Sequence, residues 1–208
     1  MNRKLILAPL ALVAALVLAT AAFAVVKKGT SGNDTLTGTA SRDRIVGFAG
    51  DDDISGFAGR DFLVGNRGAD TISGGDGGDG IVGGYGADDL SGDGGHDLLI
   101  GGYGADTASG GDGNDRLLGG YHADRLSGDA GNDVLVGGAG ADTIDGGDGN
   151  DRIFGGGGND TLSGGAGDDQ IHAFAGSDTV TCGDGADTVY IKRTATLPAD
   201  CETRFPTP

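Results

Sequence analysis

The sequence predicts an all-β protein in which short parallel strands stack as repeated turns, and three observations support this prediction. Glycine supplies 46 of the 208 residues, and glycine is costly in helix interiors, so an ordinary helical or α/β core is nearly excluded. Aspartate recurs every nine residues from Asp34 to Asp187 without an insertion or deletion. A branched aliphatic residue follows two positions after almost every one of these aspartates. A disordered chain would not maintain such a regular nine-residue spacing.

The composition also excludes several classes of function. The formal net charge is −17 at pH 7, and Glu202 is the single glutamate among 31 acidic residues. Nucleic-acid binding needs a basic surface, so we expect no nucleic-acid partner. Four prolines cannot support a collagen triple helix.

The first 24 residues have the pattern of a secretory signal. Arg3 and Lys4 precede an apolar run over residues 5–18, and Ala22 and Ala24 provide the small residues of a cleavage site. A membrane anchor is the alternative, but the run is short for a span. We expect residues 1–24 to be a signal peptide and 25–28 a short lead. The mature chain should then be secreted, without a membrane span.

The repeat covers residues 29–190 in eighteen units of nine residues. We number each unit from its first residue, which is glycine in the first sixteen units, so the aspartate is at position six and the aliphatic at position eight. Ala108 is the single exception at position eight. Three residues centred on one aliphatic make a short strand with that side chain facing inward. One unit buries almost nothing, whereas stacked units bury a continuous ladder.

Position nine alternates between two kinds of residue. Odd units have mostly Ser or Thr there, while even units from Val46 to Phe154 have an apolar residue. This eighteen-residue period is expected if two strands make one turn.

Glycine returns at positions two and four, as in Gly146-Gly147-Asp148-Gly149-Asn150-Asp151. This pattern resembles the nonapeptide of RTX (haemolysin-type) calcium-binding repeats. The resemblance implies a right-handed parallel β-roll (β-solenoid) of about nine two-strand turns, on the order of 43 Å long. It also implies several calcium ions, each bound between consecutive loops on one edge by motif aspartates and loop carbonyls. Calcium prefers 6–8 hard oxygen ligands, and closely stacked carboxylates repel one another unless cations intervene.

We rank the units by how well their loops fit the motif. Residues 65–172 match best, and residues 29–64 are degenerate. Thr30, Thr39, Phe48 and Phe57 stand at position two of these first units, and such residues resist positive φ. The stronger predicted calcium ligands are Asp70, Asp79, Asp88, Asp97, Asp106, Asp115, Asp124, Asp133, Asp142, Asp151, Asp160 and Asp169. The weaker ones are Asp34, Asp43, Asp52, Asp61, Asp178 and Asp187. The alternative is that these aspartates are only turn residues.

The two outer faces should differ. Residues next to an inward-facing aliphatic point outward. The apolar residues at position nine of the even units should therefore form an outward-facing stripe. We call it the apolar stripe, and it is a candidate interface for a homodimer or a protein partner. Its candidate residues are Val82, Ile100, Leu118, Val136 and Phe154. Cross-strand packing within the sheet is the alternative. The Thr/Ser face supports an alternative function as a structural, adhesive or ice- and surface-binding rod. Tyr85, Tyr103 and Tyr121, spaced by eighteen, should stack along one edge.

Residues 191–208 leave the repeat pattern and should cap the rod. Cys182 and Cys201 are the two cysteines, and an even pair in an exported chain indicates a disulfide. Free thiols are the alternative. A bridge closing a loop of roughly twenty residues contributes about 3 kcal/mol in the chain-entropy model. It would also protect an open strand edge from aggregation.

No catalytic motif is present. His96, His122 and His172 are isolated, and neither a His-Glu-x-x-His nor a Gly-x-Ser-x-Gly motif occurs. The sequence therefore predicts a secreted, non-enzymatic calcium-binding β-roll that serves as a binding or scaffold module.

Overall fold

The computed structural model describes residues 24–191 and 201–204. The signal peptide predicted over residues 1–24 therefore lies almost entirely outside the described residues, as does most of the predicted cap at 191–208. The described part consists of β-strands and loops, without a helix.

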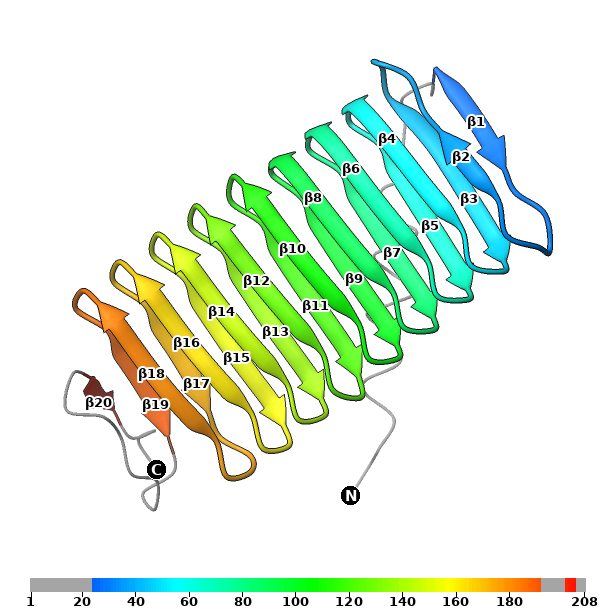
Figure 1. The fold of residues 1–208 in the computed structure, drawn as a ribbon. Helices are drawn as coiled ribbons and strands as arrows, with labels where there is room; N and C mark the ends of the chain where they lie inside the picture. Colours follow the sequence, from blue (N-terminus) through cyan, green and yellow to red (C-terminus); the bar gives the residue numbers. More distant parts are fainter. Residues whose placement is uncertain (1–23, 192–200, 205–208) are drawn as a thin grey trace, which may run out of the picture.

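The strands form two parallel sheets that face each other along a rod (Figure 1). The larger sheet has 11 strands. They are β1 (Val25–Lys28), β3 (Asp43–Ala49), β5 (Phe62–Arg67), β7 (Gly80–Tyr85), β9 (Leu98–Tyr103), β11 (Arg116–Tyr121), β13 (Val134–Ala139), β15 (Arg152–Gly157), β17 (Gln170–Ala173), β19 (Thr188–Ile191) and β20 (Glu202–Arg204).

The smaller sheet has 9 strands. They are β2 (Thr35–Thr37), β4 (Asp53–Gly59), β6 (Thr71–Gly77), β8 (Asp89–Gly95), β10 (Thr107–Asp112), β12 (Arg125–Ala130), β14 (Thr143–Asp148), β16 (Thr161–Ala166) and β18 (Thr179–Asp184).

The register follows the eighteen-residue period. Leu117 pairs with Leu99 on one side and with Leu135 on the other, and the same shift of eighteen holds throughout the repeat. Successive units alternate between the sheets, so two units make one turn. The predicted parallel β-solenoid of about nine turns is therefore confirmed.

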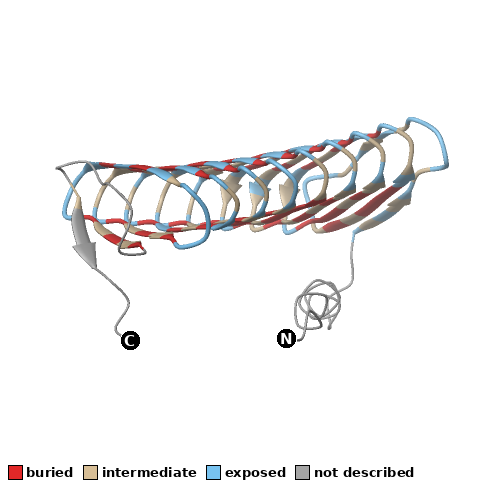
Figure 2. Cartoon of the chain, turned by 90° about the horizontal axis from the view of Figure 1, so that it is seen from below, coloured by how far each residue is buried: buried red, intermediate tan, exposed pale blue. Residues whose placement is uncertain are grey.

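The core is a ladder of single aliphatic side chains between the sheets. From Ile45 to Val189 the residues at position eight are 0–6 % exposed, and Ala108 occupies its place in the ladder at 2 %. Figure 2 shows buried residues recurring along both sheets, with exposed residues in the connecting loops. The periodicity thus correctly assigns the inward face of the repeat strands from β3 to β19.

Glycine at position four lets adjacent loops stack in contact. Gly131 has φ +135°, and a Cβ on it would overlap the carbonyl oxygen of Gly113 in the preceding turn. A side chain here would push the turns apart. Glycine at position four therefore allows consecutive turns to stack at the distance that β-pairing between their strands requires.

The N-terminal end of the rod contains a strand that the sequence did not indicate. Residues 25–28, expected to be only a lead, form β1 and pair with β3 at the eighteen-residue shift. Lys27 consequently takes the inward position eight, and its Nζ donates a hydrogen bond to the carbonyl oxygen of Thr37 in the opposite sheet. This contact links the two sheets where the aliphatic ladder ends.

The C-terminal end is closed by the predicted disulfide. Cys182 in β18 is bonded to Cys201, with their Cα atoms 5.7 Å apart. Cys201 precedes β20, which pairs in parallel with β19 of the opposite sheet. The bond therefore connects the two sheets at this end.

Candidate metal centres along the two edges

The loops between the sheets form two edges of different chemistry. We call acidic edge the loops that end at Asp43, Asp61 and so on to Asp187, because seven further aspartates lie on it: Asp76, Asp93, Asp112, Asp129, Asp148, Asp168 and Asp184. We call tyrosine edge the loops that end at Asp34, Asp52 and so on to Asp178. Tyr85, Tyr103 and Tyr121 stack there as predicted, with ring centroids 5.0 and 4.6 Å apart.

From Asp43 to Asp187, each motif aspartate accepts a backbone N–H of the preceding turn with its Oδ1 atom and so joins consecutive turns. The backbone N–H of Asp115 donates to Asp133 Oδ1 at 2.7 Å, and that of Asp133 donates to Asp151 Oδ1 at 2.8 Å. The same bond joins Asp106 to Asp124 on the tyrosine edge, at 2.9 Å. It recurs along both edges, so one oxygen of each of these carboxylates has a structural role.

The Oδ2 atom of most motif aspartates is buried without a hydrogen-bond donor. Among the described residues fifteen such atoms occur, in Asp52, Asp61, Asp70, Asp79, Asp88, Asp97, Asp106, Asp115, Asp124, Asp133, Asp142, Asp151, Asp160, Asp169 and Asp187. Buried polar atoms normally have partners, and an unpaired one costs about 1–3 kcal/mol. Their regular recurrence along both edges makes them candidate ligands for cations.

Burial also changes the acidity of these carboxyl groups. Desolvation raises the pKa of Asp88, Asp97, Asp124 and Asp133 to about 7, against the lowering effect of the backbone hydrogen bond to Oδ1. Neighbouring aspartates of adjacent turns raise it further. A calcium ion would favour the ionised form at these sites.

Backbone oxygens of the next turn converge on the same region. A Cβ placed on Gly110 would lie 2.5 Å from Asp115 Oδ2 and 2.8 Å from the carbonyl oxygen of Gly128. The two oxygens, from adjacent turns, therefore lie close together. No cluster of three His, Cys, Asp or Glu side chains suited to a metal occurs in the described residues. Backbone carbonyls would have to complete the ligand set, as calcium sites allow.

Three loops do not have the unpaired atom. Asp34 Oδ2 accepts hydrogen bonds from Thr30, Asp43 Oδ2 accepts them from Thr39, and Asp178 is only partly buried. The expectation that Phe48 and Phe57 avoid positive φ is wrong, because they adopt φ +86° and +78°. Asp52 and Asp61 of those loops accordingly have the same unpaired Oδ2 as the better-matched units.

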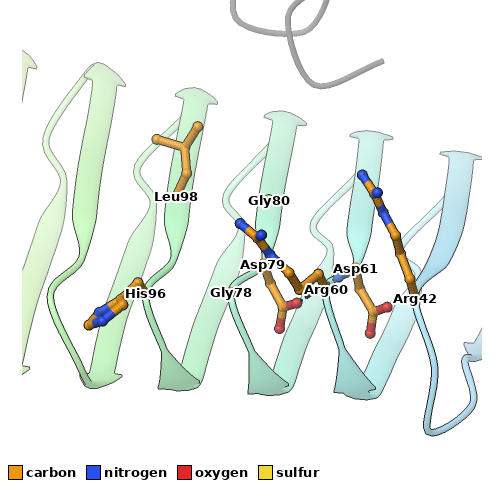
Figure 3. Close-up of a pocket in the computed structure, with 8 residues that line it drawn as sticks. All are labelled: Arg42, Arg60, Asp61, Gly78, Asp79, Gly80, His96 and Leu98. Carbon is orange, nitrogen blue, oxygen red and sulfur yellow. Dashed lines mark hydrogen bonds between the residues drawn. The ribbon is translucent and has the colours of Figure 1, made fainter. Parts of the chain in front are cut away.

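A pocket of about 320 Å³ lies on the acidic edge near its N-terminal end. Gly78 and Gly80 have no side chains, which leaves space on one turn. Arg60 and His96 lie on the turns on either side of it (Figure 3). Figure 3 also shows the carboxylates of Asp61 and Asp79 pointing the same way from adjacent turns. The Arg60 charge lowers the pKa of Asp79, although desolvation is the larger effect and raises it overall to about 6. This pocket is thus a stretch of the same carboxylate row, opened by two glycines.

The apolar stripe lies on the outer face of the larger sheet as predicted, but little of its apolar surface is exposed to solvent. Val82, Ile100, Leu118, Val136 and Phe154 are cross-strand neighbours in the larger sheet. However, Ile100 is only 5 % exposed, and the other four are half-buried. The stripe ends in a stack of Phe154, His172 and Tyr190 rings, with centroids 4.4 Å apart.

Hydroxyl groups on the opposite face are engaged in internal hydrogen bonds. Ser73 and Ser91 donate to the two carboxylate oxygens of Asp93 at 2.6 and 2.7 Å. The Ser73 bond is the main reason that the pKa of Asp93 is lowered. Ser109 and Ser127 donate to Asp129 in the same way. The middle of the Thr/Ser face is therefore a hydrogen-bonded network rather than a row of free hydroxyls.

Side chains at position five form a further ladder that the sequence analysis missed. The N–H of Asn132 donates to Asn114 Oδ1, and the N–H of Asn150 donates to Asn132 Oδ1, both at 2.7 Å. The recurrence of Asn at this position on the acidic edge is the signal that could have revealed it.

The fold and the edges define a class of protein: a parallel β-solenoid whose glycine-rich loops present rows of buried carboxylates suited to divalent cations. A family model described as RTX calcium-binding nonapeptide repeat (4 copies) matches residues 28–63, 55–90, 64–99, 82–117, 100–135, 118–153, 127–162 and 154–189. The chain belongs to this family of calcium-binding repeat proteins. No curated protein matches the chain.

Proposed function

We propose that the protein is a secreted, non-catalytic rod that folds when calcium ions enter between its stacked loops, and that it serves as a binding or scaffold module. The observation that supports this best is the set of fifteen buried Oδ2 atoms without a donor, repeated along both edges. Cations at these positions would satisfy the unpaired oxygens and reduce the repulsion between turns. Motif aspartates and loop carbonyls would hold them, with the strongest sites at the twelve aspartates from Asp70 to Asp169.

Secretion is part of this proposal. The pattern of residues 1–24 and the Cys182–Cys201 disulfide both support an extracellular location, since disulfides persist in oxidising compartments. No helix able to span a membrane is found in the described part of the chain.

The Thr/Ser face is a less well supported basis for function. An adhesive or ice-binding face needs free, regularly spaced hydroxyls. Here four central serines are bonded to Asp93 and Asp129. Asp53, Asp89 and Arg125 also interrupt the neighbouring row.

Calcium titration of the purified mature protein, followed by circular dichroism, tests the proposal. We expect a cooperative gain of β signal at roughly 10⁻⁴–10⁻³ M calcium, as for extracellular modules. Magnesium is the matched control and should be much less effective, because it demands near-ideal octahedral geometry and dehydrates reluctantly. Retention of the same β spectrum in excess chelator would contradict calcium-driven folding.

A further inference from the structure

The residue at position two differs between loops in a way that matches the state of the aspartate. In fifteen loops this residue has positive φ, and these are the same fifteen whose aspartate Oδ2 is buried and unpaired. In three loops position two is Thr30, Thr39 or Phe174, whose φ is not positive. Their aspartates, Asp34, Asp43 and Asp178, have no such unpaired atom.

The two threonines act directly on the aspartate. The backbone N–H of Thr30 donates to Asp34 Oδ2 at 2.6 Å, and its hydroxyl donates to the same atom at 3.0 Å. Thr39 does the same to Asp43 Oδ2, at 2.5 and 2.9 Å. A carboxylate oxygen has two lone pairs, so both are engaged, and the donated hydrogens face any approaching cation with positive partial charge.

Backbone conformation explains why the residue at position two donates to the aspartate Oδ2 only in the Thr30 and Thr39 loops. At positive φ, as at Gly147 with φ +98°, no donor reaches the Oδ2 atom of the loop's aspartate. β-branched residues resist positive φ, so threonine keeps the N–H directed at the carboxylate. Its hydroxyl then adds a second donor in the same direction.

We propose that position two decides whether a loop takes a calcium ion, and that Thr30 and Thr39 close the first two loops to calcium by serving as internal replacements for the ion. This inference rests on the proposed calcium-dependent folding. The closed loops lie one on each edge, so together they make the first turn of the rod independent of calcium. The Lys27 contact to the opposite sheet and the bond from Val25 N–H to Asp43 Oδ1 at 2.8 Å hold the same turn without metal.

The first test opens the two loops. In the full mature chain, Thr30→Gly with Thr39→Gly permits positive φ and removes both hydroxyls. Equilibrium dialysis at saturating calcium should show about two more bound ions per chain than wild type, one for each loop. Thr30→Ser with Thr39→Ser, the matched control, keeps both donors and should bind the wild-type number. An unchanged number in the folded glycine variant would overturn the inference.

The second test does not depend on the glycine variant reaching the native fold. Asp34→Asn with Asp43→Asn should leave the number of bound ions at the wild-type value. Asp124→Asn with Asp133→Asn changes one loop on each edge in the well-matched region and should lower that number. Equal losses in the two pairs would overturn the inference. A wild-type chain that binds no calcium would instead refute the proposed function itself.

Discussion

At the scale of single residues, the two carboxylate oxygens differ in fifteen of the eighteen motif aspartates. In Asp133, Oδ1 accepts the N–H of Asp115 and ties two turns together, whereas Oδ2 is buried without a donor. The two interpretations of the repeated aspartate, turn residue and calcium ligand, are therefore compatible. Asparagine could provide the first task but not a charged second oxygen.

The raised pKa values of the buried aspartates predict how pH affects the metal-free protein. Burial raises the pKa of Asp124 and Asp133 to about 7, compared with about 3.9 in an unfolded chain. Because the folded pKa is the higher one, protonation stabilises the fold. This contribution is complete below about pH 4 and is lost as pH rises through about 7.

Circular dichroism in metal-free buffer should consequently show more β structure at pH 5 than at pH 8. Saturating calcium should reduce or reverse that trend, because the ion replaces the proton and favours ionised carboxylates. Identical unfolded spectra at both pH values without metal would contradict this prediction.

At the scale of elements, adjacent residues of one strand lie in opposite environments. In β11, Leu117 faces the core and is 1 % exposed, whereas Leu118 faces outward and is half-buried. Leu118 contacts its cross-strand neighbours, so the outer stripe contributes to packing within the larger sheet. Association through this stripe remains a proposal, for which a second copy of the chain is the simplest partner.

The pair Leu117→Ser and Leu118→Ser tests both facing and association. The first change places an unpaired hydroxyl and a cavity in the core, so we expect a loss of roughly 3–5 kcal/mol in the free energy of unfolding in calcium. The second should cost about 1 kcal/mol or less. Denaturant unfolding measures both, and equal losses would contradict the assignment of the two faces.

Sedimentation of the same Leu118→Ser variant in calcium addresses the proposed partner. A lower apparent mass than that of wild type would support association through the stripe. Equal monomeric masses would assign the stripe to packing alone.

At the scale of the whole molecule, the rod is a stack whose ends need separate solutions. Every internal turn is covered by two neighbours, whereas an end exposes core and unpaired backbone groups. The N-terminal end is closed by β1, with Lys27 across it, and by the bonded Thr30 and Thr39 loops. The C-terminal end is closed by β20 and by the disulfide between the sheets.

Loss of the disulfide should weaken mainly the C-terminal end. Cys182→Ala with Cys201→Ala removes a loop closure over a sequence separation of 19, which is worth about 3 kcal/mol in the chain-entropy model. We expect a lower denaturation midpoint in calcium and faster amide exchange in β17–β20, with the middle of the rod little changed. Reductant should lower the wild-type midpoint but not that of the variant. Uniform loss of protection along the rod would contradict a local role.

Much of this architecture followed from the sequence by itself. A nine-residue period places one aliphatic in each strand, the eighteen-residue alternation at position nine requires two strands per turn, and the cysteine pair indicated the bridge. Such features repeat with the chain, so local chemistry and spacing determine them. The family resemblance, carried by the same residues, supplied the calcium hypothesis.

Only the tertiary structure decided what depends on contacts between turns. The difference in hydrogen bonding between Oδ1 and Oδ2 arises because the N–H that Oδ1 accepts belongs to a residue eighteen positions earlier. Phe48 and Phe57 adopt a positive φ against their local preference, as do Asn66 and Gly75 at the equivalent positions of the following turn. Threonine at the equivalent position keeps its preferred conformation and satisfies the carboxylate instead. This choice between two backbone states depends on packing against the adjacent turn, which the spacing of residues along one chain does not encode.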